Sequence, residues 1–381
     1  MLNCLDVPEY CLIDNDALLK TEVESWQHHE SIAIDTEFVR TNTYYPKLGL
    51  IQIAVDKRYY LIDPLKIKDN APLRELLENP SLVKVFHACS EDLEVFQSHL
   101  GVLPTPIFDT QIAAALSGHG AAPGYKNLVE QLFGIQLAKG EQRSDWLQRP
   151  LSKEQLAYAV MDVVYLETIY QQQLSGLKAS NRLSWAQEES SLLLSKQQEG
   201  VDPELCYQRV KGAAKLSSGA LTVLQALAAW REYKARDKDL PRGFVLKDQV
   251  LLVLARQQPH TLDDLQLVDG VSSRLVRQQG KELLEIIERA LIQDKPVQPL
   301  ENALSSQSRS ILKKMQSLVA EKAEKSHIES GTLMSRKLLL KLLTLVTSTG
   351  TMVFPPEIGF WKQELLGDDL KKLLIESGVL S

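Results

Sequence analysis

The sequence predicts an α/β domain, a mixed sheet flanked by helices, followed by all-α helical bundle modules. In the first half, short segments rich in Ile and Val alternate with helical patterns. In the second half, apolar residues recur at helical spacing and no segment has a convincing strand pattern. The 381 residues are 44% hydrophobic and 24% charged, which is typical of a globular chain with two or three domains.

The first half contains four expected strands, at residues 31–38, 49–55, 59–62 and 83–87. The first three follow one another closely, so they predict an antiparallel meander. The fourth is followed by a helical pattern, and β-α units favour parallel pairing. Together the two patterns predict a mixed sheet covered by helices.

Helices are expected between and after these strands. A short helix over 73–77 should end before Asn79-Pro80, and Ser90 is suited to cap a helix that begins at Glu91 and runs toward Leu100. Further helical patterns cover residues 110–116, 127–133 and 152–173.

The second half reads as two helical blocks. The segment DKPVQPL (294–300) contains two prolines and is the expected linker between them. Segments 224–234 and 315–325 are faintly alike, which fits either a degenerate duplication or chance agreement between amphipathic helices. We therefore expect domains at 1–206, 207–295 and 296–381.

Charge is unevenly distributed along the chain. The formal net charge is −6, with −10 on residues 1–200 and +4 on residues 201–381. The overall sign argues against a protein that coats nucleic acid nonspecifically. The division fits an acidic catalytic domain joined to a mildly basic binding domain, although chance variation in surface charge explains it equally well.

Cysteine usage and hydropathy exclude other classes. The four cysteines form no C-x-x-C pair, so neither a zinc knuckle nor a disulfide framework is indicated. No apolar run approaches the roughly 18 residues that a membrane span needs, and the first ten residues lack the pattern of a secretory signal. These features favour a cytoplasmic protein without a membrane partner.

Several carboxylates could carry chemistry. Asp35 and Glu37 should share one face of a strand, where they repel each other unless a cation compensates, and Mg²⁺ and Mn²⁺ prefer oxygen ligands. Asp92 falls in the first turn of a helix, where it also suits the helix dipole. Tyr158 and Asp162 are four residues apart and lie on one helix face. Taken singly, each of these carboxylates also fits an ordinary exposed acid, and the tyrosine also fits an ordinary packed residue.

Two other positions have competing interpretations. His87 and Cys89 could suggest zinc, but no partner pair has ligand spacing, so core packing is favoured. Phe38 could stack on a terminal base or belong to the core.

In their order and setting, these residues resemble the ribonuclease D family of the DEDD exonuclease superfamily. The resemblance rests on Asp35-Thr36-Glu37-Phe38, Leu50-Ile51-Gln52, Phe86-His87-Ala88, Glu91-Asp92-Leu93, SDWLQRPL (144–151) and YAVMD (158–162). Tyr158 stands four residues before Asp162, and position 157 is Ala where the histidine subtype would have His, so the tyrosine subtype is favoured.

The first helical block is similar to HRDC modules. Ala229-Trp230-Arg231, Asp239-Leu240-Pro241 and Asp248 carry this likeness. The last block lacks such a motif, and its assignment as a second HRDC-like module follows from family architecture.

The resemblance implies a ribonuclease H-like nuclease domain that hydrolyses phosphodiesters with two divalent metal ions, Mg²⁺ or Mn²⁺. Asp35 would bridge both ions, Glu37 and Asp162 would complete the site of the attacking water, and Asp92 would serve the second ion. Tyr158 would orient the water through its hydroxyl group.

The expected activity is 3′→5′ trimming of structured RNA, above all transfer RNA precursors, by a monomer that releases 5′-mononucleotides. The alternatives are a single-stranded DNA exonuclease and a noncatalytic RNA-binding scaffold. The acidic metal site does not separate RNA from DNA, because that discrimination depends on contacts to the 2′-hydroxyl. The expected nucleic-acid contacts are Phe38, Lys211, Lys215, Arg231, Lys234, Arg236 and Lys238.

Overall fold

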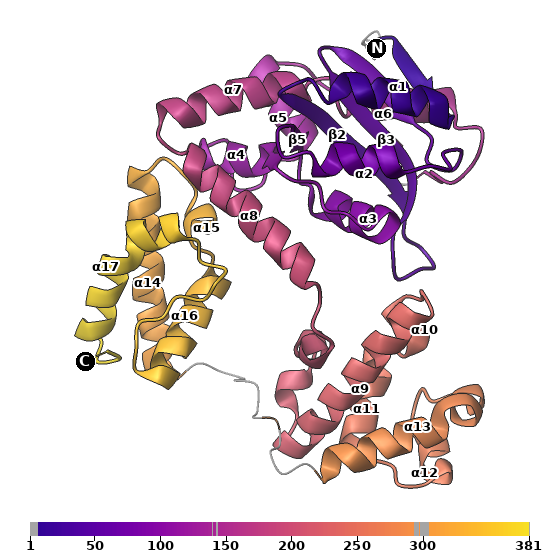
Figure 1. Cartoon of the computed structure of the whole chain (residues 1–381). Coiled ribbons are helices and arrows are strands. Elements are labelled where there is room, and N and C mark those ends of the chain that lie inside the picture. Colours follow the sequence, from indigo (N-terminus) through magenta and orange to yellow (C-terminus); the bar gives the residue numbers. More distant parts are fainter. Residues whose placement is uncertain (1–6, 139, 142–143, 293–296, 298–304, 381) are drawn as a thin grey trace. The chain divides into compact units, whose positions relative to one another are not determined.

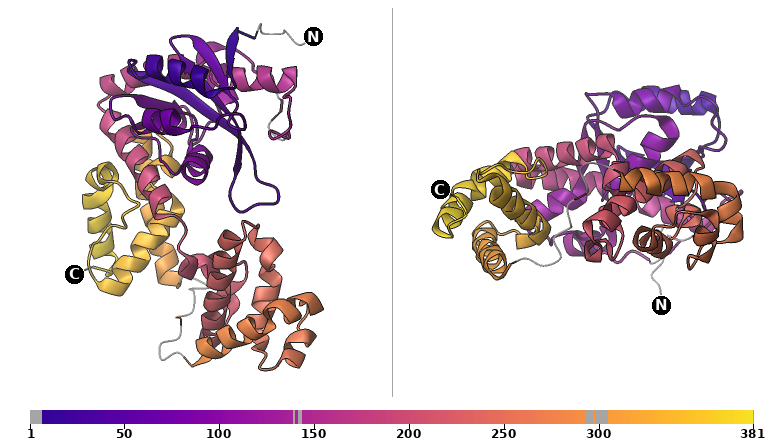
Figure 2. Two further views of the ribbon diagram at one scale, coloured as in Figure 1. Left: turned by 45° about the vertical axis from the view of Figure 1, so that its right-hand side comes forward. Right: turned by 90° about the horizontal axis from the view of Figure 1, so that it is seen from below.

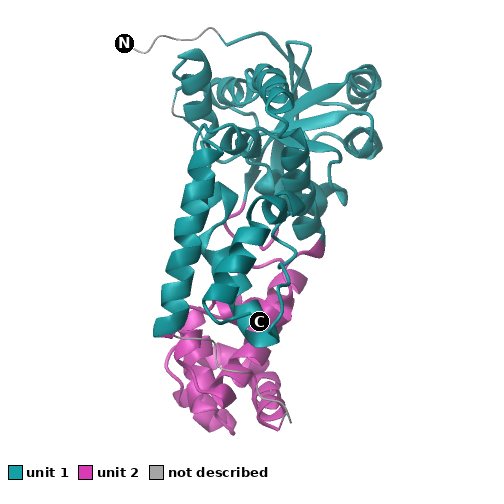
Figure 3. Cartoon of the chain, turned by 90° about the vertical axis from the view of Figure 1, so that its left-hand side faces the viewer, with its two compact units in different colours: residues 1–39, 46–198, 306–381 teal, residues 40–45, 199–305 magenta. Residues whose placement is uncertain are grey.

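The computed structural model describes residues 7–138, 140–141, 144–292, 297 and 305–380. Its internal contacts divide the chain into two compact units (Figure 3). Unit 1 comprises residues 1–39, 46–198 and 306–381, and unit 2 comprises residues 40–45 and 199–305. In the described part of the chain, no helix is both long enough and apolar enough to cross a membrane.

Unit 1 contains a mixed sheet of six strands in the order β1-β4-β3-β2-β5-β6 (Figure 1). The strands are β1 (Tyr10–Ile13), β2 (Ser31–Val39), β3 (Lys47–Val55), β4 (Arg58–Ile62), β5 (Val83–Phe86) and β6 (Ile107–Asp109). β3 is antiparallel to β2 and β4, which confirms the predicted meander. β1, β5 and β6 pair in parallel with β4, β2 and β5.

The two edge strands were not predicted from the sequence. β1 has four residues and β6 has three, so neither is long enough for an alternating pattern to stand out. Backbone pairing with β4 and β5 defines them.

Helices cover both faces of the sheet. On one face, α1 (Asp16–Trp26), α2 (Ala71–Glu78) and α3 (Ser90–Leu100) bury their apolar side chains against Ile32 and Ile34 of β2. On the opposite face, α6 (Lys153–Met161) packs on β4, and α7 (Leu166–Ala179) packs on β2, β3 and β5. α4 (Thr110–Leu116) and α5 (Tyr125–Phe133) join α7 in a smaller core.

Two helix boundaries differ from the expectation. The single helix expected over 152–173 is two helices, because α6 ends at Met161, Asp162 is its cap residue, and α7 begins at Leu166. Ser90 does not cap α3; it is the first helical residue and Cys89 is the cap. The turn before α3 is held by Asp109, whose carboxylate accepts the N–H groups of Ala88 and Cys89.

The last helical block belongs to unit 1, where it packs beside α8 (Leu183–Glu199) (Figures 1 and 2). The block consists of α14 (Ser306–Lys325), α15 (Ser330–Leu333), α16 (Arg336–Thr349) and α17 (Phe360–Glu376). The rings of Trp185 and Trp361 stack with centroids 4.5 Å apart. Lys362 pairs with Glu189 at 2.8 Å, and Glu188 accepts the backbone N–H of Trp361.

Unit 2 is a helical bundle built around one long central helix, α9 (Ser218–Asp237). Around it are two 3₁₀ helices, Pro203–Arg209 and Ala213–Lys215, and α10 (Arg242–Val245), α11 (Asp248–Gln257), α12 (Leu262–Leu267) and α13 (Ser273–Leu291). The described residues of 207–381 contain no strand, as the sequence predicts.

The short segment 40–45 is fastened to unit 2 by Tyr44. The Tyr44 hydroxyl donates to Glu232 and accepts from Arg242 at 3.0 Å and Arg236 at 3.2 Å. Asp239 accepts the backbone N–H of Tyr44 at 3.0 Å. Burial alone would raise the pKa of Glu232, but hydrogen bonds from Arg242, Tyr44 and Arg236 outweigh it and lower this pKa to about 2.

The two domain boundaries expected from the sequence are 206/207 and 295/296. Residue 206 lies inside the 3₁₀ helix Pro203–Arg209, whereas unit 2 resumes at Glu199. The boundary at 295/296 lies outside the described residues, as does most of the expected linker 294–300. The three-domain division from the sequence remains a proposal.

Candidate active site

Strand β2 carries the first two carboxylates. Asp35 and Glu37 point to one face of the sheet, because side chains alternate along a strand. Asp35 stands opposite Gln52 on β3 and Glu37 stands opposite Leu50. The pairing register shifts immediately after Glu37, between Glu37 and Phe38. Pairing with β3 along this stretch places both carboxylates on a rigid support.

Asp162 joins them from helix α6. This helix packs on the same face of the sheet through the fully buried Ala159 and Val160, and Asp162 is its C-terminal cap residue. Ligand oxygens of Asp35, Glu37 and Asp162 all lie within 4.8 Å of one another. Two strand residues and one helix residue, far apart in the sequence, thus form one compact acidic group.

Asp92 reaches this region from the other face of the sheet. It lies in the first turn of α3, which packs on the face that carries Thr36. The Thr36 hydroxyl donates a 2.5 Å hydrogen bond to Asp92 Oδ1. Asp92 is not part of the compact three-residue group, but its negative charge raises the pKa values of both Asp35 and Glu37.

The four carboxylates are costly to ionise, because they are buried and repel one another. In the portions of the chain that the structure describes, none of the four forms an ion pair. Burial, followed by the neighbouring carboxylates, raises the pKa of Glu37 to about 9 and that of Asp35 well above its usual range. Burial also raises the pKa of Asp92 to about 7 and that of Asp162 to about 6.

These residues fit a hard divalent cation. Converging carboxylate oxygens are the ligands that Mg²⁺ and Mn²⁺ prefer, and a cation relieves the repulsion among them. Gln52, opposite Asp35, supports the fit, because neither polar atom of its buried amide has a hydrogen-bond partner among the described residues. In the described residues, Asp35, Glu37 and Asp162 are also the only acidic, His or Cys group suited in geometry to hold a metal.

Tyr158 lies one helical turn before Asp162, and its side chain lowers the Asp162 pKa against the larger effect of burial. Burial, then the charges of Asp162 and Glu37, raises the Tyr158 pKa above its ordinary value. The phenol therefore stays protonated at neutral pH, which suits a group that positions a water and not one that removes its proton.

Lys126 is a neighbour of the site that sequence reasoning missed. Its Nζ lies 4.9 Å from the centroid of the Tyr158 ring and donates to the carbonyl of Ala138. Its positive charge lowers the pKa values of Glu37 and Asp162 against the larger effect of burial. A single lysine near a helix start has no pattern that could have identified it.

The SDWLQRPL segment (144–151) supports the site through hydrogen bonds of Arg149 and the packing of Trp146. Arg149 binds both carboxylate oxygens of Asp63 at 2.7 Å and donates to the carbonyls of Gly49 and Trp146. A Cβ at position 49 would stand 2.5 Å from the Trp146 carbonyl oxygen, so only glycine permits this approach. The fully buried Trp146 ring then lies 6.2 Å from that of Tyr158.

Tyr125 holds the backbone next to Asp162. Its hydroxyl donates to the Met161 carbonyl at 3.2 Å and accepts from the N–H of Tyr165 at 3.1 Å. These two bonds span the turn between α6 and α7, so they fix the position from which Asp162 projects.

The zinc interpretation of His87 and Cys89 is not supported. The two ring nitrogens of His87 are bonded to Thr110 Oγ1 at 2.9 Å and to the Pro123 carbonyl at 3.0 Å. Cys89 is fully buried in the core of the sheet. Phe38 is half-buried and packs against the same core.

The basic residues expected to contact RNA have different surroundings. Lys211, Lys215 and Lys238 are exposed. Lys234 pairs with Glu282 at 3.2 Å, and Arg236 pairs with Glu232. Arg231 is only 5% exposed and donates to Asp248 and to the Leu246 carbonyl, so it is not a residue of the open surface.

Two family models match the chain. Residues 10–176 match the 3′-5′ exonuclease model, and residues 220–287 match the HRDC domain model. The first match contains the four carboxylates and Tyr158.

Curated relatives match nearly the whole chain. The Ribonuclease D of Pseudomonas paraeruginosa is 38% identical over 96% of this chain and 98% of the relative. The Ribonuclease D of Escherichia coli is 39% identical over 96% of this chain and 99% of the relative.

Solved structures agree in fold. The crystal structure of Escherichia coli RNase D, an exoribonuclease involved in structured RNA processing, matches with a TM-score of 0.88 at 39% identity over 97% of this chain and 99% of that chain. The catalytic core of RRP6 from Trypanosoma brucei matches with a TM-score of 0.59 at 28% identity over 76% of this chain and 81% of that chain.

Proposed function

Because the chain belongs to the ribonuclease D family and is a 3′→5′ exoribonuclease, we propose that it trims the 3′ ends of structured RNA, transfer RNA precursors above all. The observation that carries the proposal is the convergence of Asp35, Glu37 and Asp162 within 4.8 Å. Structured RNA is favoured because a relative that matches over almost its whole length processes it.

The reaction we propose is hydrolysis supported by two divalent ions, Mg²⁺ or Mn²⁺. Bound at these carboxylates, such ions would lower the pKa of the attacking water and neutralise charge on the phosphate. Asp35, Glu37 and Asp162 would hold one ion, with Asp35 shared by both, and Asp92 would serve the second.

The chain's own residues would orient the reactants. The protonated Tyr158 hydroxyl would hydrogen-bond the attacking water and hold it against Asp162. Lys126 would hold positive charge beside Glu37 and Asp162, where the anionic substrate arrives. Hydrolysis would release 5′-mononucleotides from a free 3′-hydroxyl end.

We further propose a monomer that acts in the cytoplasm. Cys11, Cys89 and Cys206 are free thiols, as expected in a reducing compartment.

Asp35→Asn is the test of the catalytic assignment. The variant should lose hydrolysis of a 3′-extended transfer RNA in Mg²⁺ while it still binds that RNA, since the substitution removes one charge from a metal ligand but little volume. Turnover within about tenfold of the wild type would contradict the assignment, because loss of a group required for catalysis costs far more.

The substrate is tested by comparing three molecules of matched length: the 3′-extended transfer RNA, an unstructured RNA and a single-stranded DNA. Faster trimming of the transfer RNA supports the proposal. Equal rates on DNA would favour the alternative of a DNA exonuclease, and binding of Mn²⁺ without hydrolysis of any of the three would favour a noncatalytic scaffold.

A further inference from the structure

Unit 2 contains a cavity of about 440 Å³ whose wall is strongly basic. Four of the seven residues that line it are cationic: Arg209, Arg231, Arg242 and Lys247. The single acid in the wall is Asp248. This volume is within the range of about 300–1,000 Å³ that is typical of ligand pockets.

Two of the four cations have charge partners inside the protein. Arg231 Nη1 lies 2.6 Å from Asp248 Oδ1, so the only acid of the wall is already neutralised. Arg242 is paired with the buried Glu232. Arg231 is 5% exposed, and its Nε has no hydrogen-bond partner among the described residues.

The other two cations give the cavity its surplus charge. Arg209 and Lys247 are both exposed, and neither forms an ion pair within the described ranges of the chain. Two unpaired cations beside two paired guanidinium groups favour an anion in the cavity.

The N-terminus of α11 adds to the positive electrostatic potential of the cavity. Lys247 is the cap residue of this ten-residue helix, and its side chain makes no capping hydrogen bond. Backbone N–H groups at an uncapped helix start carry partial positive charge and bind phosphate readily. The helix start and the basic wall therefore both favour an anionic ligand such as phosphate.

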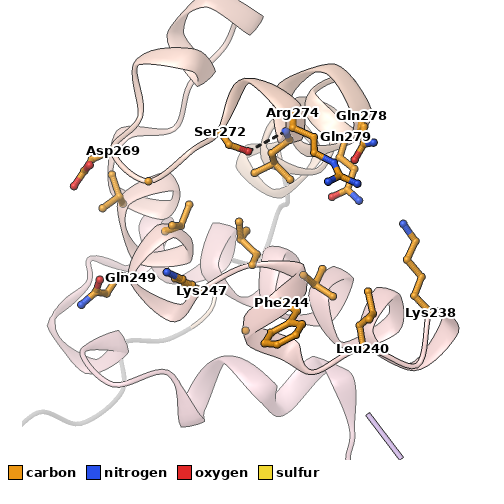
Figure 4. Close-up of a pocket in the computed structure, with 17 residues that line it drawn as sticks. Lys238, Leu240, Phe244, Lys247, Gln249, Asp269, Ser272, Arg274, Gln278 and Gln279 are labelled. Atoms are coloured by element: carbon orange, nitrogen blue, oxygen red, sulfur yellow. Dashed lines mark hydrogen bonds between the residues drawn. The ribbon is translucent and has the colours of Figure 1, made fainter. Parts of the chain in front are cut away.

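A groove of about 660 Å³ adjoins this cavity, since Gly243 and Lys247 line both. Phe244 is 66% exposed on one side of the groove, and Figure 4 shows Arg274, Gln278 and Gln279 on the other. An exposed aromatic ring offers a stacking surface to a base of single-stranded nucleic acid, and the amides offer donors and acceptors to its edge.

We propose that the basic cavity binds a phosphate group and that the adjoining groove holds the attached nucleoside, so that unit 2 grips one nucleotide of single-stranded RNA. The choice of RNA rests on the proposed function, while the phosphate site rests on the cavity itself. Arg209 and Lys247 are the phosphate contacts, and Phe244 stacks on the base.

The test measures binding of a fluorescent oligoadenylate to the full-length protein in EDTA across a series of salt concentrations. For Arg209→Gln/Lys247→Gln we expect the Kd to rise about tenfold and the salt slope to fall by about 0.7, because both side chains contact one phosphate and each neutralised phosphate of a single strand contributes about 0.7. The matched control, Arg256→Gln/Lys281→Gln, removes the same charge from exposed residues of unit 2 that line neither space.

Phe244→Leu tests the groove separately. It keeps an apolar side chain and removes the ring, so the Kd should rise about fivefold with an unchanged salt slope. An unchanged Kd would overturn the stacking role of Phe244.

Competition with inorganic phosphate and with adenosine 5′-monophosphate identifies the source of the phosphate. If inorganic phosphate or adenosine 5′-monophosphate competes with the oligoadenylate, free phosphates enter the cavity. If neither competes and the double variant still binds more weakly, the cavity binds the phosphate of the RNA backbone. Equal affinities and slopes for the double variant and its control would overturn the proposal. EDTA prevents hydrolysis, so this outcome is independent of whether Asp35→Asn abolishes catalysis.

Discussion

The Thr36 hydroxyl donates a 2.5 Å hydrogen bond to Asp92 Oδ1 and so connects strand β2 to helix α3. Thr36 lies between the two strand carboxylates, Asp35 and Glu37, but faces the opposite side of the sheet. The bond therefore links the acidic group on one face of the strand to the fourth carboxylate, which comes from the other face.

Thr36→Val should weaken metal binding without unfolding the domain. Burial raises the Asp92 pKa to about 7 although the Thr36 hydrogen bond lowers it, so losing the bond should raise this pKa further and weaken the ionised form. We expect the Mg²⁺ concentration for half-maximal rate to rise about tenfold, as is common when a group that orients a metal ligand is lost. Thr36→Ser keeps the hydroxyl and should behave as the wild type; equal Mg²⁺ dependence of all three proteins would contradict the role of Thr36.

The metal-free protein should lose stability as pH rises. A carboxyl group whose pKa is raised on folding binds protons more tightly in the folded state, so stability falls between the ordinary carboxyl range of about 4 and the raised value. The raised values are about 6 for Asp162, about 7 for Asp92 and about 9 for Glu37. Asp35→Asn removes one of the repelling charges and should diminish this loss.

Thermal unfolding in EDTA checks this prediction. Relative to the wild type, Asp35→Asn should raise the Tm by about 3 °C or more near pH 8.5 and by less near pH 5, where more of the carboxyl groups are protonated. Asp56→Asn alters an exposed acid and should change neither value. A gain for Asp35→Asn that is larger at the lower pH would show that the sign is wrong.

Tyr158→Phe should be milder than any carboxylate substitution. The variant loses the hydroxyl that positions the water but keeps the ring beside Trp146 and Lys126. We expect kcat to fall about 10- to 100-fold, in the lower range for loss of a positioned catalytic group, with the Mg²⁺ dependence unchanged. A variant as inactive as Asp35→Asn would require a larger role for Tyr158.

Trp361→Ala should destabilise unit 1. Trp361 is 2% exposed, stacks on Trp185 and donates from Nε1 to Glu189 at 2.8 Å, so its removal leaves a cavity and takes away one hydrogen bond to Glu189. The free energy of unfolding should fall by about 3 kcal/mol or more. Phe360→Ala is the matched control, since this neighbouring ring is 64% exposed and should cost about 0.5 kcal/mol or less.

Denaturant unfolding of both variants separates two views of the last helical block. Equal stability of Trp361→Ala and Phe360→Ala would mean that the block is a loosely attached module. A large difference would show that it is part of the folding unit of the nuclease domain.

The sequence by itself determined the elements with a strong local signal. The Ile- and Val-rich segments 31–38 and 49–55 predicted the central strands, and therefore that Asp35 and Glu37 share a face, because side-chain direction along a strand follows from position alone. The helical spacing of Tyr158 and Asp162 likewise held in the structure, since both belong to α6 and its cap. The resemblance of these motifs to ribonuclease D then identified the family.

Only the tertiary structure decided which of these groups meet and which charges remain unpaired. The convergence of Asp162 with β2, the arrival of Asp92 at Thr36 from the other face, and the nearness of Lys126 depend on helix packing between distant segments. The same holds in unit 2, where Arg231 and Arg236 look like free cations in the sequence but are held by Asp248 and Glu232. A local pattern sets the direction of a side chain, but burial and the partner that neutralises its charge are properties of the folded chain.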